Sequence, residues 1–284
     1  MSRMIAFFAV CACLPGLAPG QLSRSGSSSF PLDPDTFDSV QFERNLRDEL
    51  RDFNRSLALA SLTLMRSRSS APGRTEQIQA TYEFLDQGVE RLSAGYPQLA
   101  IDQYFDPLLD AFEDMLAEQP LATYVARSDK EGMYYILTAA SRDQNVQAIG
   151  SYGADVYYWK ALALTLLDER EGAEASLARA LELSPAHSWF LSQKAQWQKN
   201  DRHWLEALAT FELAANYARL LTPADERSVE LGFALRGRAY VLVELGRLEE
   251  AATQYKECLE LNSDDTEAQT ELAYVQELLK RRGR

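Results

Sequence analysis

The sequence is poor in the residues on which most catalytic and metal sites depend. Three cysteines and two histidines occur among its 284 residues, and Cys11 and Cys13 both lie within the first 20 positions. Without those positions Cys258 would stand alone, which excludes an internal disulfide. His187 and His203 fall at expected helix junctions, and no cysteine–histidine spacing suits a structural zinc site. We therefore expect no catalytic residues, no metal and no cofactor.

The sequence also lacks a glycine-rich phosphate loop and an excess of basic residues. Lysine and arginine number 29 against 42 aspartates and glutamates, a formal net charge of −13. Because phosphates favour a basic face, this balance argues against nucleic acid as the main partner. The basic tail Lys280–Arg284 ends a helix, where positive charge suits the helix dipole. Its alternative role is contact with an anionic membrane or polymer.

The apolar run near the N-terminus, Met4–Leu14, is too short to span a bilayer. Arg3 precedes it, and Ala18–Gly20 offers small residues for cleavage. This pattern is typical of a secretory signal peptide over residues 1–20. We therefore expect an exported protein without an integral membrane span, with the periplasm as its destination. A lipoprotein acylated at Cys13 and a secreted protein are the alternatives.

Residues 21–38 are rich in serine, glycine and proline and predict a flexible linker. Helical spacing begins after it, and Ser39–Met65 is predicted to form one long amphipathic helix. Its apolar positions are Phe42, Leu46, Leu50, Phe53, Leu57 and Leu64. A helix pair follows, and the two parts make up an N-terminal helical region over residues 39–118.

Residues 119–153 are predicted to be a helical connector. Ser128 and Glu131 have the spacing of a capping box and predict a helix that continues to Ala140. Gln144–Ile149 is expected to add a short helical turn.

The second half of the chain contains a repeated triplet of small, large and small residues. Ala173, Leu177 and Ala180 recur 34 positions later, and again a further 44 positions on. The later copies are Ala207, Phe211 and Ala214, then Ala251, Tyr255 and Cys258. A period of 34 with this triplet is typical of a helix–turn–helix repeat, and the longer interval indicates a ten-residue insertion. Small residues at these positions let the two helices of a hairpin approach closely.

These residues resemble the tetratricopeptide repeat (TPR) family, and in particular its exported bacterial members. The resemblance implies an all-α, TPR-like α-solenoid of antiparallel helix hairpins, with the N-terminal helical region added to it. The implied repeats cover residues 154–187, 188–221 and 232–265, and residues 266–284 form a capping helix. The ten-residue insertion is explained by a helix that restarts at Thr222–Asp225.

The resemblance extends weakly to the N-terminal helix pair. Gly88, Gly95, Ala100 and Tyr104 fall on repeat positions, whereas Pro107 replaces a small residue inside the second helix. We therefore expect a degenerate TPR-like hairpin that bends at this proline.

In the TPR family the first helices of the repeats line a concave groove that binds partners. Carried over by position, the resemblance implies these groove contacts: Tyr158, Trp189, Gln196, Phe233, Arg236, Tyr240 and Tyr274. Tyr240 and Tyr274 lie 34 positions apart and should stack along the groove. The alternative for Tyr158, Trp189 and Phe233 is packing between helices. The lysine and asparagine that clamp a peptide carboxylate in some members are replaced by Tyr158 and Leu162, which argues against that mode.

The resulting hypothesis is an adaptor that mediates protein–protein or protein–peptide interaction through its concave groove. The alternative is a structural subunit of a cell-envelope complex that packs through its convex face or its N-terminal helix. An enzyme with a site in the connector Tyr124–Gly153 is a third, weaker hypothesis. The identity of the partner is beyond the sequence.

Overall fold

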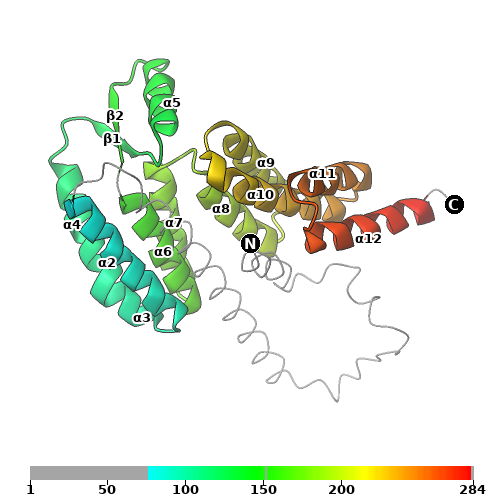
Figure 1. Cartoon of the computed structure of the whole chain (residues 1–284), viewed down its shortest axis with the longest axis horizontal. Coiled ribbons are helices and arrows are strands. Elements are labelled where there is room, and N and C mark those ends of the chain that lie inside the picture. The colour runs from blue at the N-terminus through cyan, green and yellow to red at the C-terminus, as the bar shows by residue number, and fades with distance from the viewer. Residues whose placement is uncertain (1–75, 151, 283–284) are drawn as a thin grey trace.

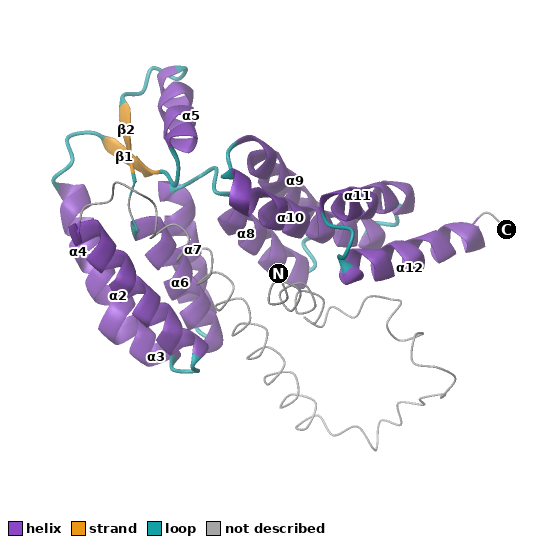
Figure 2. Cartoon of the chain, viewed as in Figure 1, coloured by secondary structure: helices purple, strands orange, loops and turns teal. Residues whose placement is uncertain are grey.

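A computed structural model describes residues 76–150 and 152–282 of the chain. The predictions for the signal peptide, the linker and the helix Ser39–Met65 lie outside the described residues. Within them, helices pack in consecutive antiparallel pairs and only two short strands occur (Figure 2). Among the described helices, none is long and apolar enough to cross a bilayer.

The helices follow one another as an extended stack, from the α2–α4 end to α12 near the C-terminus (Figure 1). The first part contains α2 (Glu76–Ser93), α3 (Pro97–Ala100), the π-helical segment η3 (Ile101–Phe105) and α4 (Asp106–Ala117). The connector contains β1 (Ala122–Val125), α5 (Asp129–Ala140) and β2 (Val146–Ile149). The array contains α6 (Gly153–Leu166), α7 (Arg170–Leu183), α8 (Ser188–Asn200), α9 (Trp204–Leu220), α10 (Ala224–Glu244), α11 (Leu248–Leu261) and α12 (Thr266–Arg282). The prediction of an all-α, TPR-like solenoid is confirmed.

The small-large-small triplets lie at the centre of the hairpins. Each of the nine side chains is at most 2% exposed, and each triplet belongs to the second helix of its pair, α7, α9 or α11. Cys258 occupies its small position with 1% exposure, and burial raises the pKa of its thiol to about 12. The cysteine is therefore a packing residue, held in the unreactive thiol form.

The ten-residue insertion lengthens α10 at its N-terminal end. The restart is as predicted, except that Pro223 takes the N-cap position. The Thr222 hydroxyl instead donates to the carboxylate of Glu230, at 2.8 Å. This extra length lets α10 reach back to the start of α8.

The first hairpin packs closely in spite of its proline. A Cβ atom on Gly88 of α2 would lie 2.7 Å from the Cβ atom of Tyr104, so no larger residue fits there. Near Pro107, where a bend is predicted, the helix has the π-helical segment η3, which ends two residues before the proline. A wider turn accommodates the missing N–H group without ending the helix.

The connector differs from its prediction. Val146–Ile149 forms strand β2, so the helical turn expected over Gln144–Ile149 is wrong. β2 pairs in parallel with β1, with Ala122 opposite Val146 and Val125 opposite Ile149. The helix expected after Ser128 is present as α5, and the Ser128 side chain accepts from the Glu131 backbone N–H group at 3.3 Å. The Glu131 carboxylate does not complete the capping box, because it turns to Arg127.

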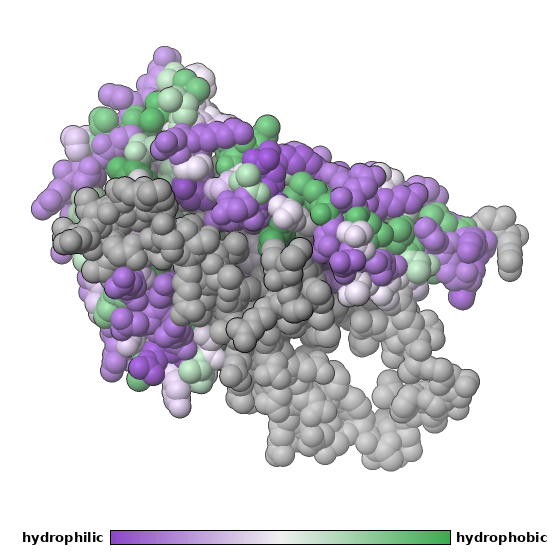
Figure 3. Space-filling model, in the orientation of Figure 1, coloured by the Kyte–Doolittle hydropathy of each residue, from purple (hydrophilic) through white to green (hydrophobic). Residues whose placement is uncertain are grey.

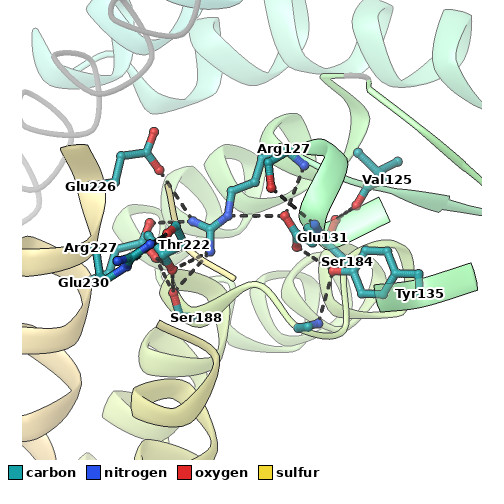
Figure 4. Close-up of polar contacts among 12 residues, drawn as sticks. Val125, Arg127, Glu131, Tyr135, Ser184, Ser188, Thr222, Glu226, Arg227 and Glu230 are labelled. Carbon is teal, nitrogen blue, oxygen red and sulfur yellow. Dashed lines mark hydrogen bonds and ion pairs between the residues drawn. The ribbon is translucent and has the colours of Figure 1, made fainter. Parts of the chain in front are cut away.

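Arg127 joins the connector to the repeat array through a buried cluster of charges (Figure 4). Its guanidinium lies 2.6 Å from Glu230 and 3.5 Å from Glu226, both on α10, and 3.3 Å from Glu131 on α5. The four side chains are at most 4% exposed. The Arg127 guanidinium also donates to the Thr222 hydroxyl at 2.8 Å. One cation thus binds carboxylates from two parts of the chain that are about a hundred residues apart.

We expect Arg127→Met to lower the free energy of unfolding by about 3 to 5 kcal/mol, because it leaves buried carboxylates without their cation. Arg170→Met is the matched control, since the Arg170 side chain is 64% exposed and its pairs with Glu174 and Asp201 lie at the surface. The control should cost at most about 1 kcal/mol. Urea unfolding followed by circular dichroism measures both, and equal losses would contradict this role for Arg127.

A glycine of α10 permits the contact between the second and third hairpins. A Cβ atom on Gly237 would lie 2.3 Å from the ring of Phe211, which is fully buried in α9. A Cβ atom on Gly232 of the same helix would meet only Arg236, at an ordinary 3.6 Å. The contact with Phe211 therefore requires glycine at position 237, whereas the space around Gly232 would accept a methyl group.

Gly237→Ala should lower the free energy of unfolding by about 1 to 3 kcal/mol, because the added methyl group forces α9 and α10 apart. Gly232→Ala should leave it unchanged or raise it by up to about 1 kcal/mol, since alanine favours the helix. Urea unfolding of the two variants side by side tests the contact. Similar stabilities would show that α9 and α10 do not meet at Gly237.

Candidate partner-binding surface

The first helices of the repeats, α6, α8 and α10, meet along one side of the array. On α8 the residues Trp189, Ser192, Gln196 and Lys199 share a face, because they follow one another at intervals of three or four. Trp189 contacts α6 and α10, and Lys199 contacts α10. This face of α8 therefore points along the row of first helices, as the TPR resemblance implies for a groove.

Three of the predicted groove residues form a buried aromatic row. Tyr158, Trp189 and Phe233 are 2%, 6% and 6% exposed. The indole N–H group of Trp189 donates to the Tyr158 hydroxyl at 2.8 Å, and its ring lies 5.2 Å from that of Phe233. The structure thus brings them together, as packing between α6, α8 and α10 rather than as exposed contacts.

Arg236 is likewise held inside the structure. It is 4% exposed, and its guanidinium lies 2.5 Å from Asp265 and 3.2 Å from Glu267. Asp265 in turn accepts from the backbone N–H group of Ala268 in the first turn of α12. Arg236 therefore positions the capping helix, and its replacement would disturb the fold before it tested binding.

Gln196 and its neighbour Ser192 present polar atoms that the described part of the chain does not satisfy. They are 4% and 0% exposed, and neither the Gln196 Nε2 atom nor the Ser192 Oγ atom has a hydrogen-bond partner there. A buried polar group without a hydrogen bond costs about 1 to 3 kcal/mol. The two atoms lie one turn apart on α8, and a ligand can reach them only when the side chains that cover them move aside.

Tyr240 and Tyr274 are the predicted residues that stay half-buried. The ammonium group of Lys199 lies over the Tyr240 ring, 4.7 Å from its centroid. Burial raises the pKa of Tyr240 well above its ordinary value, and the carboxylates of Glu244 and Glu271 raise it further. The phenol is thus a neutral hydrogen-bonding group with a partly accessible ring, the kind of side chain that binding surfaces favour.

Burial destabilises the ionised form of two glutamates near these tyrosines. Burial raises the pKa of Glu267 to about 7, although the Arg236 cation opposes the change. Burial also raises the pKa of Glu244, against the hydrogen bond that it shares with Tyr240. Glu244 was not predicted as a site residue from the sequence. It could have been found from its position four residues after Tyr240, which places both side chains on the same face of α10. The end of the row of first helices near α12 therefore holds carboxylates whose pKa values are raised.

The two histidines lie at helix starts. His187 precedes α8, is 4% exposed and stacks on Phe190 with ring centroids 3.7 Å apart. His203 precedes α9 and faces Glu206 at the surface. Across residues 76–150 and 152–282, no group of histidine, cysteine and acidic side chains is arranged to hold a metal ion.

A cavity of about 180 Å³ opens between the α6–α7 turn and α8. Trp197 lines it, together with Arg170 and Asp201, which pair with each other at its rim. It belongs to the junction of the first two repeats and not to the connector, where the enzyme hypothesis places its site.

The fold is a helical-repeat scaffold. Family models support the same class: a tetratricopeptide repeat model matches residues 154–187, and a TPR repeat model matches residues 239–280. The two matches fall on the first repeat and on the third repeat with its cap, and they support the TPR family. TPR repeats generally mediate protein–protein interactions and are typically not enzymes. No curated protein matches the chain.

The raised pKa of Glu267 leads to a prediction for stability. The folded state keeps the Glu267 proton at a higher pH than the unfolded chain does, so its contribution to stability is lost as the pH rises towards and through 7. Glu267→Gln cannot ionise and should gain stability relative to the parent chain between pH 5 and pH 8, by on the order of 1 kcal/mol.

Urea unfolding across this pH range measures the difference. Glu277→Gln is the matched control, because Glu277 lies on the same helix with its side chain 51% exposed. The control should follow the parent chain at every pH. A constant difference between Glu267→Gln and the parent chain would contradict the assignment.

Proposed function

We propose that the protein is an adaptor that binds another protein or a peptide through the row of first helices α6, α8 and α10. The observation that carries the proposal is that Ser192 Oγ and Gln196 Nε2, one turn apart on the first-helix side of α8, are buried without hydrogen-bond partners. Polar atoms without hydrogen bonds lower the stability of the fold, and a partner that moves the covering side chains aside and supplies the missing bonds recovers this stability.

The residues around this pair support a peptide-like ligand. An extended segment has free backbone carbonyl and N–H groups, and a helical segment has polar side chains, and either can match a donor and a hydroxyl spaced one turn apart. Lys199 and Tyr240 lie further along the same row and add a cation and a half-buried ring. The ligand surface that fits is therefore mixed, with apolar side chains between backbone or side-chain amides.

We further propose that the adaptor works outside the cytoplasm, in the periplasm. This part rests on the sequence of residues 1–20 alone, with its short apolar run after Arg3. The partner is then a protein or peptide of the same compartment.

The alternative, a structural subunit that packs through its convex face, is favoured by one specific observation. Leucine side chains on the outer face of α9 are exposed, among them Leu205 at 71%. This surface is separate from the row of first helices, so the two functions are compatible in one chain.

The adaptor proposal predicts that one double variant keeps its stability but loses its binding. Ser192→Ala with Gln196→Met removes both unsatisfied polar atoms while it keeps the apolar bulk of the side chains. We expect the free energy of unfolding to stay equal or rise by about 1 to 3 kcal/mol, since the cost of the unbonded atoms disappears. Partner capture from an extract of the cell envelope should fall by at least about tenfold.

The measurement compares capture by the parent chain and the variant, with the bound proteins quantified by mass spectrometry. Lys194→Met is the matched control, because Lys194 is exposed on α8 and is turned about 200° from Gln196. The control should capture as much as the parent chain. Undiminished capture by the double variant would rule out this face of α8 as the binding surface.

A further inference from the structure

The junction between the first two hairpins differs in composition from the junctions that follow it. The cavity of about 180 Å³ lies at this first junction, between the α6–α7 turn and α8. Four positions that line the cavity have equivalents in the later repeats, counted from the shared triplets. At the first junction these positions hold Arg170, Glu174, Trp197 and Asp201. At the second junction they hold Trp204, Leu208, Val241 and Leu245. At the third junction they hold Leu248, Ala252, Val275 and Leu279.

The later junctions show that the solenoid does not require charge at these positions. All eight side chains of the second and third junctions are apolar and lie in the main hydrophobic core or pack against it. At the first junction three of the four side chains are charged, and the space between the helices stays open. A cavity that the stack of hairpins could fill with leucine, and does not, is a candidate for binding.

The lining of the cavity is negatively charged. Three carboxylates, those of Asp168, Glu174 and Asp201, stand against the single guanidinium of Arg170. Arg170 donates to Asp201 at 3.0 Å and to Glu174 at 2.7 Å, so these two carboxylates already share its charge. Among the described residues, none forms a hydrogen bond or an ion pair with the Asp168 carboxylate. One carboxylate in the lining is therefore free to bind a cation.

The remaining walls of the cavity offer an aromatic ring and hydrogen-bond acceptors. Trp197 is partly buried against the core, and its ring forms one wall. The Thr165 hydroxyl donates to the Ala161 carbonyl at 2.8 Å, so its oxygen can only accept from a ligand. Asn200 adds a side-chain carbonyl. A guanidinium matches this set, because it is planar, stacks on aromatic rings and has five donors but no acceptor.

We propose that this cavity binds the guanidinium of an arginine side chain from the partner, stacked on Trp197 and hydrogen-bonded to Asp168. The cavity is large enough, since an engineered cavity of about 150 Å³ holds a benzene molecule. An anion does not fit, because the one cation in the lining is already bound by two carboxylates. A lysine ammonium fits less well, since it is compact and does not stack on a flat ring.

The charge of the whole chain supports a basic partner. The formal net charge is −13, and Figure 3 shows that hydrophilic residues predominate over the array on the face that it draws. Such a surface attracts a cationic segment over a longer range than the cavity itself. That the arginine belongs to a protein or peptide rests on the proposed function, whereas the cavity can be tested with a small probe.

The probe is acetyl-arginine amide, titrated into the ¹⁵N-labelled full-length chain and followed by NMR. The chain has four tryptophans, and the indole N–H signal of Trp197 is identified by its loss in Trp197→Phe. Acetyl-arginine amide should shift this signal with a Kd on the order of 1 mM. Acetyl-citrulline amide has the same shape without the charge and should bind at least about tenfold more weakly.

Asp168→Asn should weaken binding of acetyl-arginine amide at least about fivefold, because it removes the free carboxylate. Asparagine tolerates the left-handed backbone of Asp168, whose φ is 63°, so the turn should be kept. Glu206→Gln is the matched control, because it removes an exposed carboxylate of α9 that does not line the cavity. The control should bind the probe as tightly as the parent chain.

A cavity-filling variant separates binding from folding. Arg170→Trp with Glu174→Leu and Asp201→Leu gives the first junction the residues of the second. It should lose probe binding, while its urea midpoint stays equal to that of the parent chain or rises, because apolar contacts replace the open space.

The test distinguishes this proposal from the adaptor proposal. Ser192→Ala with Gln196→Met should bind acetyl-arginine amide as the parent chain does, since neither residue lines the cavity. An unchanged Trp197 signal at about 20 mM probe, well above the expected Kd, would overturn the arginine site. Equal binding of acetyl-citrulline amide would overturn it too, as would undiminished binding by Asp168→Asn or by the cavity-filling variant.

Discussion

Close contact at alanine-sized positions is the constraint on which the rest of the structure depends. In α7, α9 and α11 the triplets are at most 2% exposed, and each brings its helix against the first helix of the same pair. Gly237 extends the rule to the next interface, where the Phe211 ring occupies the space that a Cβ atom would need. Because helices that approach this closely have little freedom to slide, the small residues fix the positions of α6, α8 and α10 relative to one another. The row of first helices, and any surface on it, follows from that.

The buried charges around Arg127 position the connector on the repeat array. The connector is not a repeat, so it has no triplet with which to align itself on the array. Three carboxylates, Glu131, Glu226 and Glu230, converge on one guanidinium instead, and the Ser188 and Thr222 hydroxyls fill its remaining donor sites. Apolar packing would tolerate several arrangements of β1 and α5, whereas a planar cation with directional donors tolerates few. The cluster contributes specificity of docking more than net stability, since the cost of removing the charges from water offsets much of their attraction.

The sequence predicted what depends on local pattern and missed what depends on distant contacts. The helix pairs could be predicted from the triplet, its period and Gly88, because each close contact between helices requires a small residue at a fixed interval. The strand Val146–Ile149 left no comparable signal, since its pairing with Ala122–Val125 joins segments some 24 positions apart in a chain of helices. The family positions led to Tyr158, Trp189 and Phe233 as groove contacts, and the structure has the alternative that the sequence also offered, packing between helices. The position of Arg236 in its repeat does not indicate that its guanidinium binds Asp265, which lies 29 residues later in the chain.

The row of first helices and the outer face of α9 belong to opposite sides of one hairpin, and this arrangement has a consequence for binding. Tyr240 and Lys199 lie on the side of the first helices, whereas Leu205, Leu213 and Leu220 of α9 are exposed on the outer side. A partner that binds one side leaves the other side uncovered. The adaptor role and the structural-subunit role therefore do not compete for the same residues, and one chain can serve both.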